Sequence, residues 1–439
     1  MIKIKGIILP GEDSDIEHKI DGILDEESRL LFIKKENNIE LLFNLVMRFE
    51  SNQIVLIGTK NEHITISDIQ FMSKYGDSSI FKTSLIGVNC NNLSEIDDLT
   101  EIRAKIRLNP KKQFNFSEKS ISFTMEGVGE FILNNKYIKI RNAIFNESKA
   151  TSWMMKIMEF VALLIGEFPE IEYFEFKSNS NGTIKKYFDI DGLTDTELFF
   201  SSNNEKIVNF NTMHGKTMKK AFSNYCELIE NDDIQLRTFF MSQSSLSRFT
   251  DYILTYILQA IEGFSRFAFD TKINRYSKRI TTKTQLEKNK VKNVNEEMIK
   301  KEQNKYNKAL AKIKQFINDN FENNILERLN GWFEHNDGNT QFNVILKYWL
   351  EKDKIVMEIF KNEIIESTSN NNINKEMLIK KTENERNRIS HSMKKSKRKK
   401  YFTHEERVLY IKKYTLMFRY IVLKKVGLKI EELPTIEEI

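Results

Sequence analysis

The distribution of proline constrains the fold of this chain more than any other feature of its sequence. The four prolines are Pro10, Pro110, Pro169 and Pro434, so residues 170–433 contain none. Proline removes a backbone donor and breaks helices, and a proline-free stretch of this length therefore favours helix. Eleven of the 16 glycines lie before residue 200. We expect two structurally different halves that meet near residue 200.

The first half has the pattern of short β-strands. Runs of β-branched and aromatic residues are bounded there by Gly, Asn, Asp or Ser, which is typical of strands. These runs are Ile4–Leu9, Leu30–Ile33, Ile39–Phe49, Ile54–Gly58, Ile64–Ile66, Ser120–Met125, Glu130–Leu133, Tyr137–Ile140, Ile171–Phe176 and Ile184–Ile190. A single helix is predicted over Ser152–Ile165. We interpret residues 1–205 as a β-rich region, a sandwich or barrel-like module with a small α/β extension.

The second half has the pattern of helices. Apolar positions recur at three- and four-residue steps, which predicts amphipathic helices. The predicted segments are a helix through Phe249–Phe267, a lysine-rich exposed helix or linker over Lys278–Phe316, a helix over Phe342–Phe360 and a helix from about Ile373 to His391. After an Asn/Ser loop at Ser367–Asn374 and the basic segment, a capping box at Thr403 opens the last helix, which Gly427 ends. The fold class is therefore α+β and multidomain, with an all-α bundle over residues 206–439.

Composition excludes several classes of protein. No uncharged apolar run reaches 18 residues and no signal peptide is evident, so we expect neither a membrane partner nor secretion. The two cysteines exclude a disulfide framework and a cysteine zinc site, and we expect a reducing cytoplasm. Residues 1–200 carry a formal net charge of −7 and residues 201–439 one of +13. This asymmetry indicates a polyanion-binding second half, or alternatively a solvated basic surface without a ligand.

One short motif in the basic half has the chemistry of phosphodiester cleavage. Arg386, Asn387 and His391 fall within one and a half helical turns, with Asn387 and His391 at positions i and i+4. A histidine can move a proton at a ribose hydroxyl or at the leaving oxygen, and an arginine can hold the phosphate bidentately. The asparagine can orient either group. No metal and no cofactor is needed, but one histidine is not enough, so a two-fold dimer would supply the second.

The asparagine carries most of the specificity of this motif. Three Arg–His pairs have a similar spacing, namely Arg328 with His335, Arg386 with His391 and Arg398 with His404. Only Arg386 is followed by asparagine, and about 0.02 such matches are expected by chance in a chain of this composition. His404 lies inside the predicted capping box, so we expect a structural role for it.

Further charged residues surround the motif. A run of basic residues follows it and is interpreted either as a grip on RNA or as a solvated loop. The run consists of Lys394, Lys395, Lys397, Arg398, Lys399 and Lys400. Glu262 and Arg388 are candidates for supporting the motif residues. The alternative for Glu262, which we favour from the sequence, is an ordinary glutamate on a helix surface.

The motif resembles that of HEPN domains, in which Arg-Asn-x-x-x-His lies between two helices of an all-α domain. Ile257–Arg266 and Phe418–Leu428 extend the resemblance to ApeA-type anti-phage proteins, and Gly6–Gly11 and Ser84–Val88 resemble their N-terminal domains. The resemblance covers most of the chain. It implies that Arg386, Asn387 and His391 are catalytic, and that the protein is a metal-independent endoribonuclease that acts as a homodimer or a higher even oligomer. It also implies RNA, with tRNA as one candidate, as substrate, and a defence role through abortive infection that a phage-encoded protein triggers.

Two other functions remain open from the residues alone. The helical half is in one case a catalytically silent module that binds RNA through Lys394–Lys400. In the other, the protein is an interaction protein whose β-rich half senses a phage component while the helices only dimerise.

Overall fold

The structure is a computed structural model that describes most of the chain. The described residues are 1–8, 18–26, 30–34, 54–59, 63–67, 70–75, 78–83, 85–88, 98–108, 110, 113–114, 116, 120–179, 182–187, 210, 213–231, 233–242, 250–289, 294–320, 341–362, 371–390 and 401–430. They form two compact units, Met1–Glu227 with Val426–Lys429, and Leu228–Lys425 with Ile430–Ile439. We had placed the division between residues 205 and 206, before the helix that ends the first unit.

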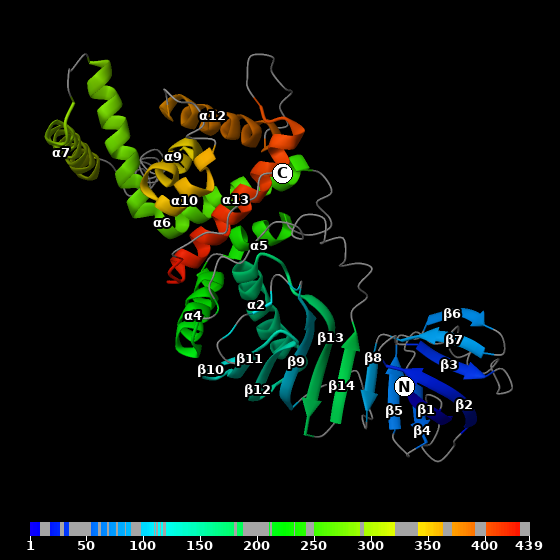
Figure 1. The fold of residues 1–439 in the computed structure, drawn as a ribbon. Helices are drawn as coiled ribbons and strands as arrows, with labels where there is room; N and C mark the ends of the chain where they lie inside the picture. The colour runs from blue at the N-terminus through cyan, green and yellow to red at the C-terminus, as the bar shows by residue number, and fades with distance from the viewer. Residues whose placement is uncertain are drawn as a thin grey trace. The chain divides into compact units, whose positions relative to one another are not determined.

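The first unit is built on one antiparallel sheet (Figure 1). Its 14 strands follow the order β10-β11-β12-β9-β13-β14-β8-β5-β4-β1-β2-β3-β7-β6. The strands are β1 Ile2–Ile8, β2 His18–Asp25, β3 Leu30–Lys34, β4 Ile54–Gly58, β5 His63–Ser67, β6 Gln70–Tyr75, β7 Ser78–Lys82, β8 Leu85–Val88, β9 Leu99–Arg107, β10 Ile121–Met125, β11 Gly129–Leu133, β12 Tyr137–Phe145, β13 Glu170–Ser178 and β14 Gly182–Tyr187. Buried residues of β1 to β5 and of β8, together with Tyr187 of β14, form a core that includes Ile4, Leu31, Leu56 and Ile64.

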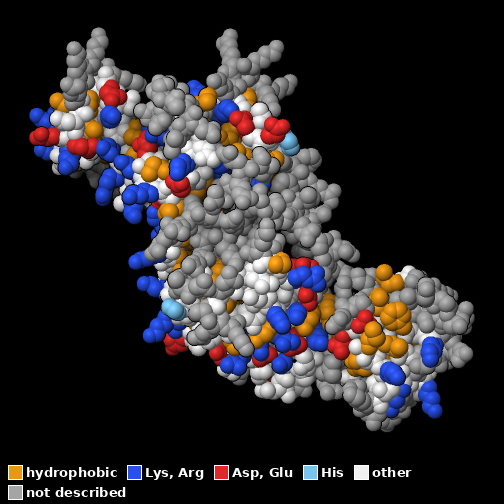
Figure 2. Space-filling view, in the orientation of Figure 1, with side chains coloured by type: hydrophobic (Ala, Val, Ile, Leu, Met, Phe, Trp, Pro, Cys, Tyr) orange, Lys and Arg blue, Asp and Glu red, His pale blue; other side chains and the backbone are white. Residues whose placement is uncertain are grey.

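Helix α2, Glu147–Ile165, covers one face of the other part of the sheet (Figure 1). In β9, Ile102, Ala104 and Ile106 are buried and alternate with partly exposed residues, as a strand with one covered face requires. Helix α4, Gly215–Asn231, adds Phe222 to the aromatic residues of this core. On the opposite face the residues are charged, and Figure 2 shows basic and acidic side chains interleaved over the β9 and β13 region.

The β-rich architecture is confirmed, while the finer expectation of a sandwich or barrel-like module stays a prediction. All described strands pair in a single order that begins at β10 and ends at β6. A second sheet is not required over β9 to β13, because α2 already buries their apolar face. Five strands were missed, namely β2, β6, β7, β8 and β9. The predicted strand Ile39–Phe49 lies outside the described residues.

The second unit is helical (Figure 1). Its helices are α5 Asp233–Ser242, α6 Thr250–Lys288, α7 Glu296–Asn320, α9 Phe342–Lys352, α10 Lys354–Ile359, α12 Asn371–Ser390 and α13 His404–Lys425. Helix α6 is kinked at Phe269, where the backbone leaves helical geometry. It packs against α5, α7, α9, α12 and α13. The rings of Phe239 and Phe264 meet Phe418 of α13 in the resulting core.

Several helix boundaries differ from those predicted. The lysine-rich stretch Lys278–Phe316 is divided between α6, which ends at Lys288, and α7, which begins at Glu296. Phe342–Phe360 is two helices, because Asp353 adopts an extended conformation and its carboxylate caps the backbone of Val356. Helix α12 begins at Asn371, inside the predicted loop.

The predicted capping box at the start of α13 is confirmed. The Thr403 backbone N–H donates to Glu406 Oε2 at 2.8 Å, and the Glu406 N–H donates to Thr403 Oγ1 at 3.1 Å. Gly427 follows α13 with a φ of +91°, the left-handed conformation that glycine accepts most easily. Among the helices described here, none is both long and apolar enough to cross a membrane.

Candidate functional site

Helix α12 carries the Arg386–Asn387 pair in its last turns. Leu378, Thr382 and Glu385 are buried at steps of four and three residues, which defines the face that packs into the unit. The Thr382 hydroxyl contacts Tyr414 Oη of α13 at 2.7 Å, which helps to fix α12 against that helix. Arg386 and Asn387 follow Glu385 directly and are partly exposed. The motif therefore begins at the edge of the buried face.

Arg386 is held by a carboxylate from another helix. Its Nη2 donates to Glu262 Oε2 of α6 at 2.7 Å, and Arg266 Nη2 donates to Glu262 Oε1 at 2.8 Å. One buried glutamate thus binds two arginines and leaves one net positive charge in the group. The Nε of Arg386 is shielded from solvent and has no hydrogen-bond partner within the described part of the chain. The guanidinium keeps donor capacity beyond its contact with Glu262.

The side-chain amide of Asn387 has a defined orientation. Arg386 Nη1 donates to Asn387 Oδ1 at 3.0 Å. A guanidinium has donors only, so the carbonyl oxygen of the amide must face it. The NH₂ group of Asn387 is therefore directed away from Arg386. The pair presents hydrogen-bond donors, which suits a phosphate or another oxyanion.

The position of Glu262 corrects the interpretation that we favoured from the sequence. We expected a glutamate on a helix surface, but Glu262 is buried, with 8% of its surface exposed. The spacing in the sequence was consistent with burial of Glu262. It follows Leu258 by four residues and precedes Ser265 by three on one helical face, and both of these neighbours are fully buried. A buried glutamate needs partners, and Arg386 is one of them.

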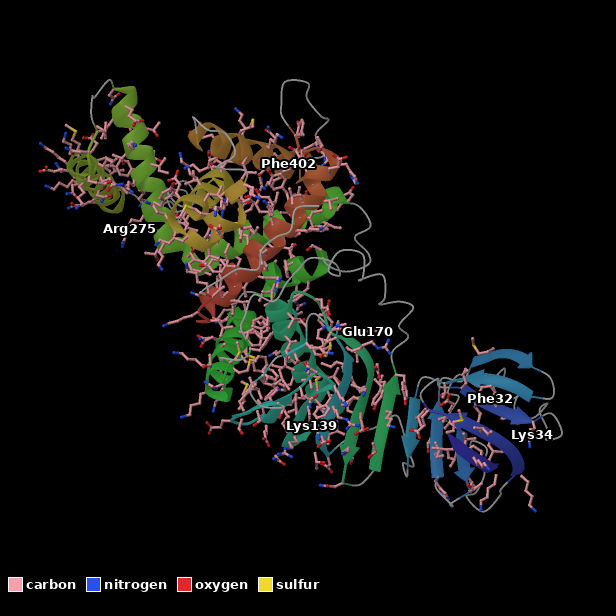
Figure 3. The ribbon with its side chains drawn as sticks, viewed as in Figure 1. Phe32, Lys34, Lys139, Glu170, Arg275 and Phe402 are labelled. Atoms are coloured by element: carbon pink, nitrogen blue, oxygen red, sulfur yellow. The ribbon has the colours of Figure 1, made fainter. Side chains whose placement is uncertain are left out.

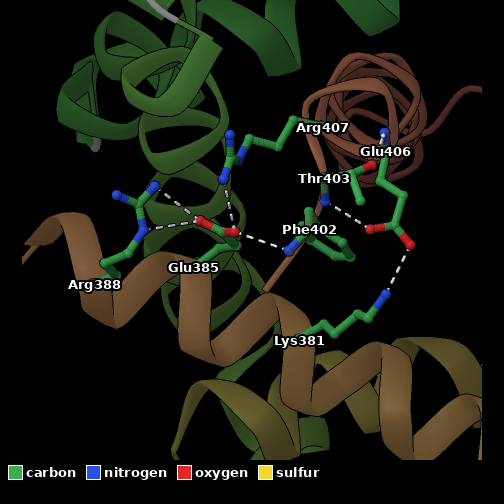
Figure 4. Close-up of polar contacts among 7 residues, drawn as sticks. All are labelled: Lys381, Glu385, Arg388, Phe402, Thr403, Glu406 and Arg407. Carbon is green, nitrogen blue, oxygen red and sulfur yellow. Dashed lines mark hydrogen bonds and ion pairs between the residues drawn. The ribbon is translucent and has the colours of Figure 1, made fainter. Parts of the chain in front are cut away.

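Glu385 is the centre of a second group of polar contacts (Figure 4). Its carboxylate is fully buried and accepts hydrogen bonds from Arg388, from Arg407 of α13 and from the backbone N–H of Phe402. The side chain of Arg388 is 14% exposed. Arg388, which we considered a supporting residue for the motif, is therefore bound to Glu385 and does not contact Arg386 or Asn387 in the contacts described here. Neither Glu385 nor Arg407 was singled out from the sequence.

The start of α13 is tied to α12 by an ion pair at the rim of this group. Lys381 Nζ lies 2.7 Å from Glu406 Oε1 (Figure 4). Burial acts to raise the pKa of Glu406, but hydrogen bonds from Lys381 and from the Thr403 N–H outweigh it and lower that pKa. Phe402, which lies beside α13 in Figure 3, is buried and stacks on Tyr410 with ring centroids 4.3 Å apart.

The structure brings together only part of the predicted site. Arg386, Asn387 and Glu262 lie on α6 and α12 within one network of hydrogen bonds, whereas Arg388 belongs to the separate group around Glu385. His391 and the basic run Lys394–Lys400 lie outside the described residues, as do both partners of the Arg328–His335 pair. His404 lies in the first turn of α13, next to the capping residue, and its side chain is exposed, so its expected structural role stays a prediction.

Comparison of the chain with protein-family models, with curated proteins and with solved structures finds no match in any of the three.

Proposed function

We propose that this protein is a metal-independent RNA endonuclease of the HEPN type, with Arg386, Asn387 and His391 as its catalytic residues. The observation that carries the proposal is the fixed Arg386–Asn387 pair, in which one guanidinium and one amide both present hydrogen-bond donors. His391 follows Asn387 by four residues in the sequence. Nothing else in the sequence combines these three residue types at this spacing.

Each residue has a distinct role in the proposed reaction. His391 takes the proton of the ribose 2′-hydroxyl, or returns one to the leaving 5′-oxygen. Arg386 stabilises the additional negative charge on the phosphate as the 2′-oxygen attacks phosphorus and the P–O5′ bond breaks. Asn387 donates from its NH₂ group to the phosphate or to His391. Glu262 holds Arg386 in place, because its carboxylate accepts hydrogen bonds from Arg386 and from Arg266.

The remaining parts of the proposal concern the assembly and the substrate. A two-fold homodimer that opposes two α12 helices would supply a second histidine, so that one acts as base and the other as acid. The basic run Lys394–Lys400 would grip the RNA backbone without reading its sequence. The first unit, which includes the β-rich sheet, would restrain the nuclease until a phage-encoded protein appears during infection in the cytoplasm.

One observation favours a different function for the same residues. Arg386 forms an ion pair with a buried glutamate, which is also how a purely structural arginine behaves. The protein would then bind RNA through its basic run and would not cut it. In that case His391→Ala leaves RNA binding and any phenotype unchanged, whereas neutralising the basic run abolishes both.

The analysis of cleavage products separates the two functions. Purified full-length protein, together with an infected-cell extract as the source of any trigger, is incubated with total RNA in EDTA. We expect fragments that end in 2′,3′-cyclic phosphate, and we expect His391→Ala to remove them. His335→Ala is the matched control, because His335 belongs to an Arg–His pair that lacks the asparagine. Equal cleavage by wild type and His391→Ala would exclude the proposed site.

A further inference from the structure

The carboxylate of Glu385 occupies a position that the proposed chemistry does not use. Its side chain has no exposed surface, yet it lies one residue before Arg386. Oε1 accepts from the Phe402 N–H at 2.9 Å and from Arg407 Nη2 at 3.3 Å. Oε2 accepts from Arg388 Nε at 3.2 Å and from its Nη2 at 3.1 Å. Four donors from three places in the chain therefore converge on one buried anion.

These contacts do more than stabilise the fold. Replacing a buried ion cluster by apolar residues of similar volume is often neutral or even stabilising, so such a cluster is weak evidence for stability. Its directional hydrogen bonds do fix geometry. A leucine at residue 385 would fill the space on the buried face of α12, but it could not define where Phe402 and Arg407 lie relative to that helix.

The same turn of α12 is held from two sides. Glu385 binds α13 through Arg407 and the residue before its capping box, while Arg386 binds Glu262 of α6. Consecutive residues of a helix point about 100° apart, so the two contacts restrain both the position of this turn and its rotation about the helix axis. Asn387 is the next residue and receives its orientation from Arg386.

We infer that Glu385 is a positioning residue for the Arg386–Asn387 pair. It acts through Phe402 and Arg407, which anchor the motif turn of α12 to the start of α13, and it does not touch the substrate. This inference rests on the proposed function. It predicts that loss of the carboxylate lowers turnover and leaves substrate affinity nearly unchanged, because the groups proposed to bind RNA are still present.

The test compares Glu385→Gln with a control on the same helix. The glutamine keeps the size of the side chain but offers one acceptor and an NH₂ group that faces other donors. Lys375→Met is the matched control, because it removes another ion pair of α12, with Glu351 of α9, and leaves the contacts of Glu385 and Phe402 intact. Both full-length variants are measured for kcat and KM on RNA under conditions where circular dichroism shows them folded, and for hydrogen exchange of the Phe402 amide.

We expect Glu385→Gln to lower kcat by about 10- to 100-fold, the loss typical of small misplacements, with KM within about threefold of wild type. We also expect its Phe402 amide to exchange at least about tenfold faster, whereas Lys375→Met changes neither kcat nor this exchange. If both variants lower kcat equally, or if folded Glu385→Gln retains kcat, Glu385 is only structural and the inference is overturned.

Two further outcomes distinguish failure of the proposed function from failure of the inference. If neither the wild type nor His391→Ala cuts RNA, the proposed function fails, and the inference that rests on it fails too. If Glu385→Gln does not fold, Arg407→Met replaces it, since that variant removes one donor to Oε1 and keeps the carboxylate. A kcat lowered threefold or more at unchanged KM then supports the inference, and an unchanged kcat contradicts it.

Discussion

The contribution of the contact between Glu262 and Arg386 to stability can be measured without any assumption about activity. Glu262→Gln keeps the shape of the side chain and one acceptor oxygen, but it removes the negative charge between Arg386 and Arg266. Hydrogen bonds to charged groups contribute about 1.5–3 kcal/mol each. One arginine can still bond to the remaining oxygen, so about one such bond is lost.

Solvent reduces the loss of stability that we expect from Glu262→Gln. The side chains of Arg386 and Arg266 are 24% and 35% exposed, whereas that of Glu262 is 11% exposed. Water therefore partly solvates the two arginines once the carboxylate is gone. We expect Glu262→Gln to lower the free energy of unfolding by about 2 kcal/mol, near the lower end of the range for a charged hydrogen bond.

A double-mutant cycle isolates the pair. Glu262→Gln, Arg386→Met and the double variant are unfolded in urea and followed by circular dichroism at 222 nm. We expect a coupling free energy of about 1 kcal/mol or more, because the residues are in direct contact. Glu406→Gln combined with Arg386→Met is the control and should be additive within about 0.5 kcal/mol. A coupling free energy below about 0.5 kcal/mol between Glu262 and Arg386 would refute the idea that Glu262 holds Arg386.

Three other perturbations test the fold around the site and beneath the sheet. Gly215→Ala should cost about 1–3 kcal/mol of unfolding free energy in urea, because its Cβ would lie 2.3 Å from the backbone oxygen of Ser122, which cannot rotate away. Asp353→Ala should lower the free energy of unfolding by about 3 kcal/mol, because the buried carboxylate is an ion-pair partner and caps the next helix. Asp353→Asn should lower it clearly less, because the asparagine keeps a capping oxygen, and equal losses measured in urea would contradict this. In the folded protein the pKa of Glu406 is below its usual value of 4.5. Glu406 therefore stabilises the fold fully above about pH 4.5, and this stabilisation is lost as the pH falls through the lowered pKa of the folded state. Glu406→Gln should therefore flatten the decline of thermal stability below pH 4.5, and Lys381→Met should reduce that decline too.

The periodic features of the chain were predictable and the tertiary ones were not. The proline-free region correctly indicated a helical second half, and the capping box at Thr403 was placed correctly because its hydrogen bonds are local in sequence. Strand β9 was missed although Ile102, Ala104 and Ile106 follow the alternation of a half-buried strand. Charged residues at the positions between them made this alternation hard to recognise in the sequence.

The supporting residues of the site depend on contacts between distant segments. Glu262 and Arg386 are 124 residues apart in sequence, and no local rule pairs them. Asp353 interrupts a segment that is apolar at helical spacing, because its side chain caps the helix that follows it. For Glu385, only the fold reveals that the side chain is buried and that Phe402 and Arg407 lie within reach.

The most direct test of the central claim is the rate of RNA cleavage in EDTA by wild type and by His391→Ala, with the phage-infected extract present in both reactions. The proposed function predicts that wild type produces fragments with 2′,3′-cyclic phosphate ends, and that His391→Ala is slower by about 100-fold or more, as expected for loss of a general acid–base group. Cleavage at the same rate by both proteins, or cleavage by wild type that requires a divalent metal, would contradict it.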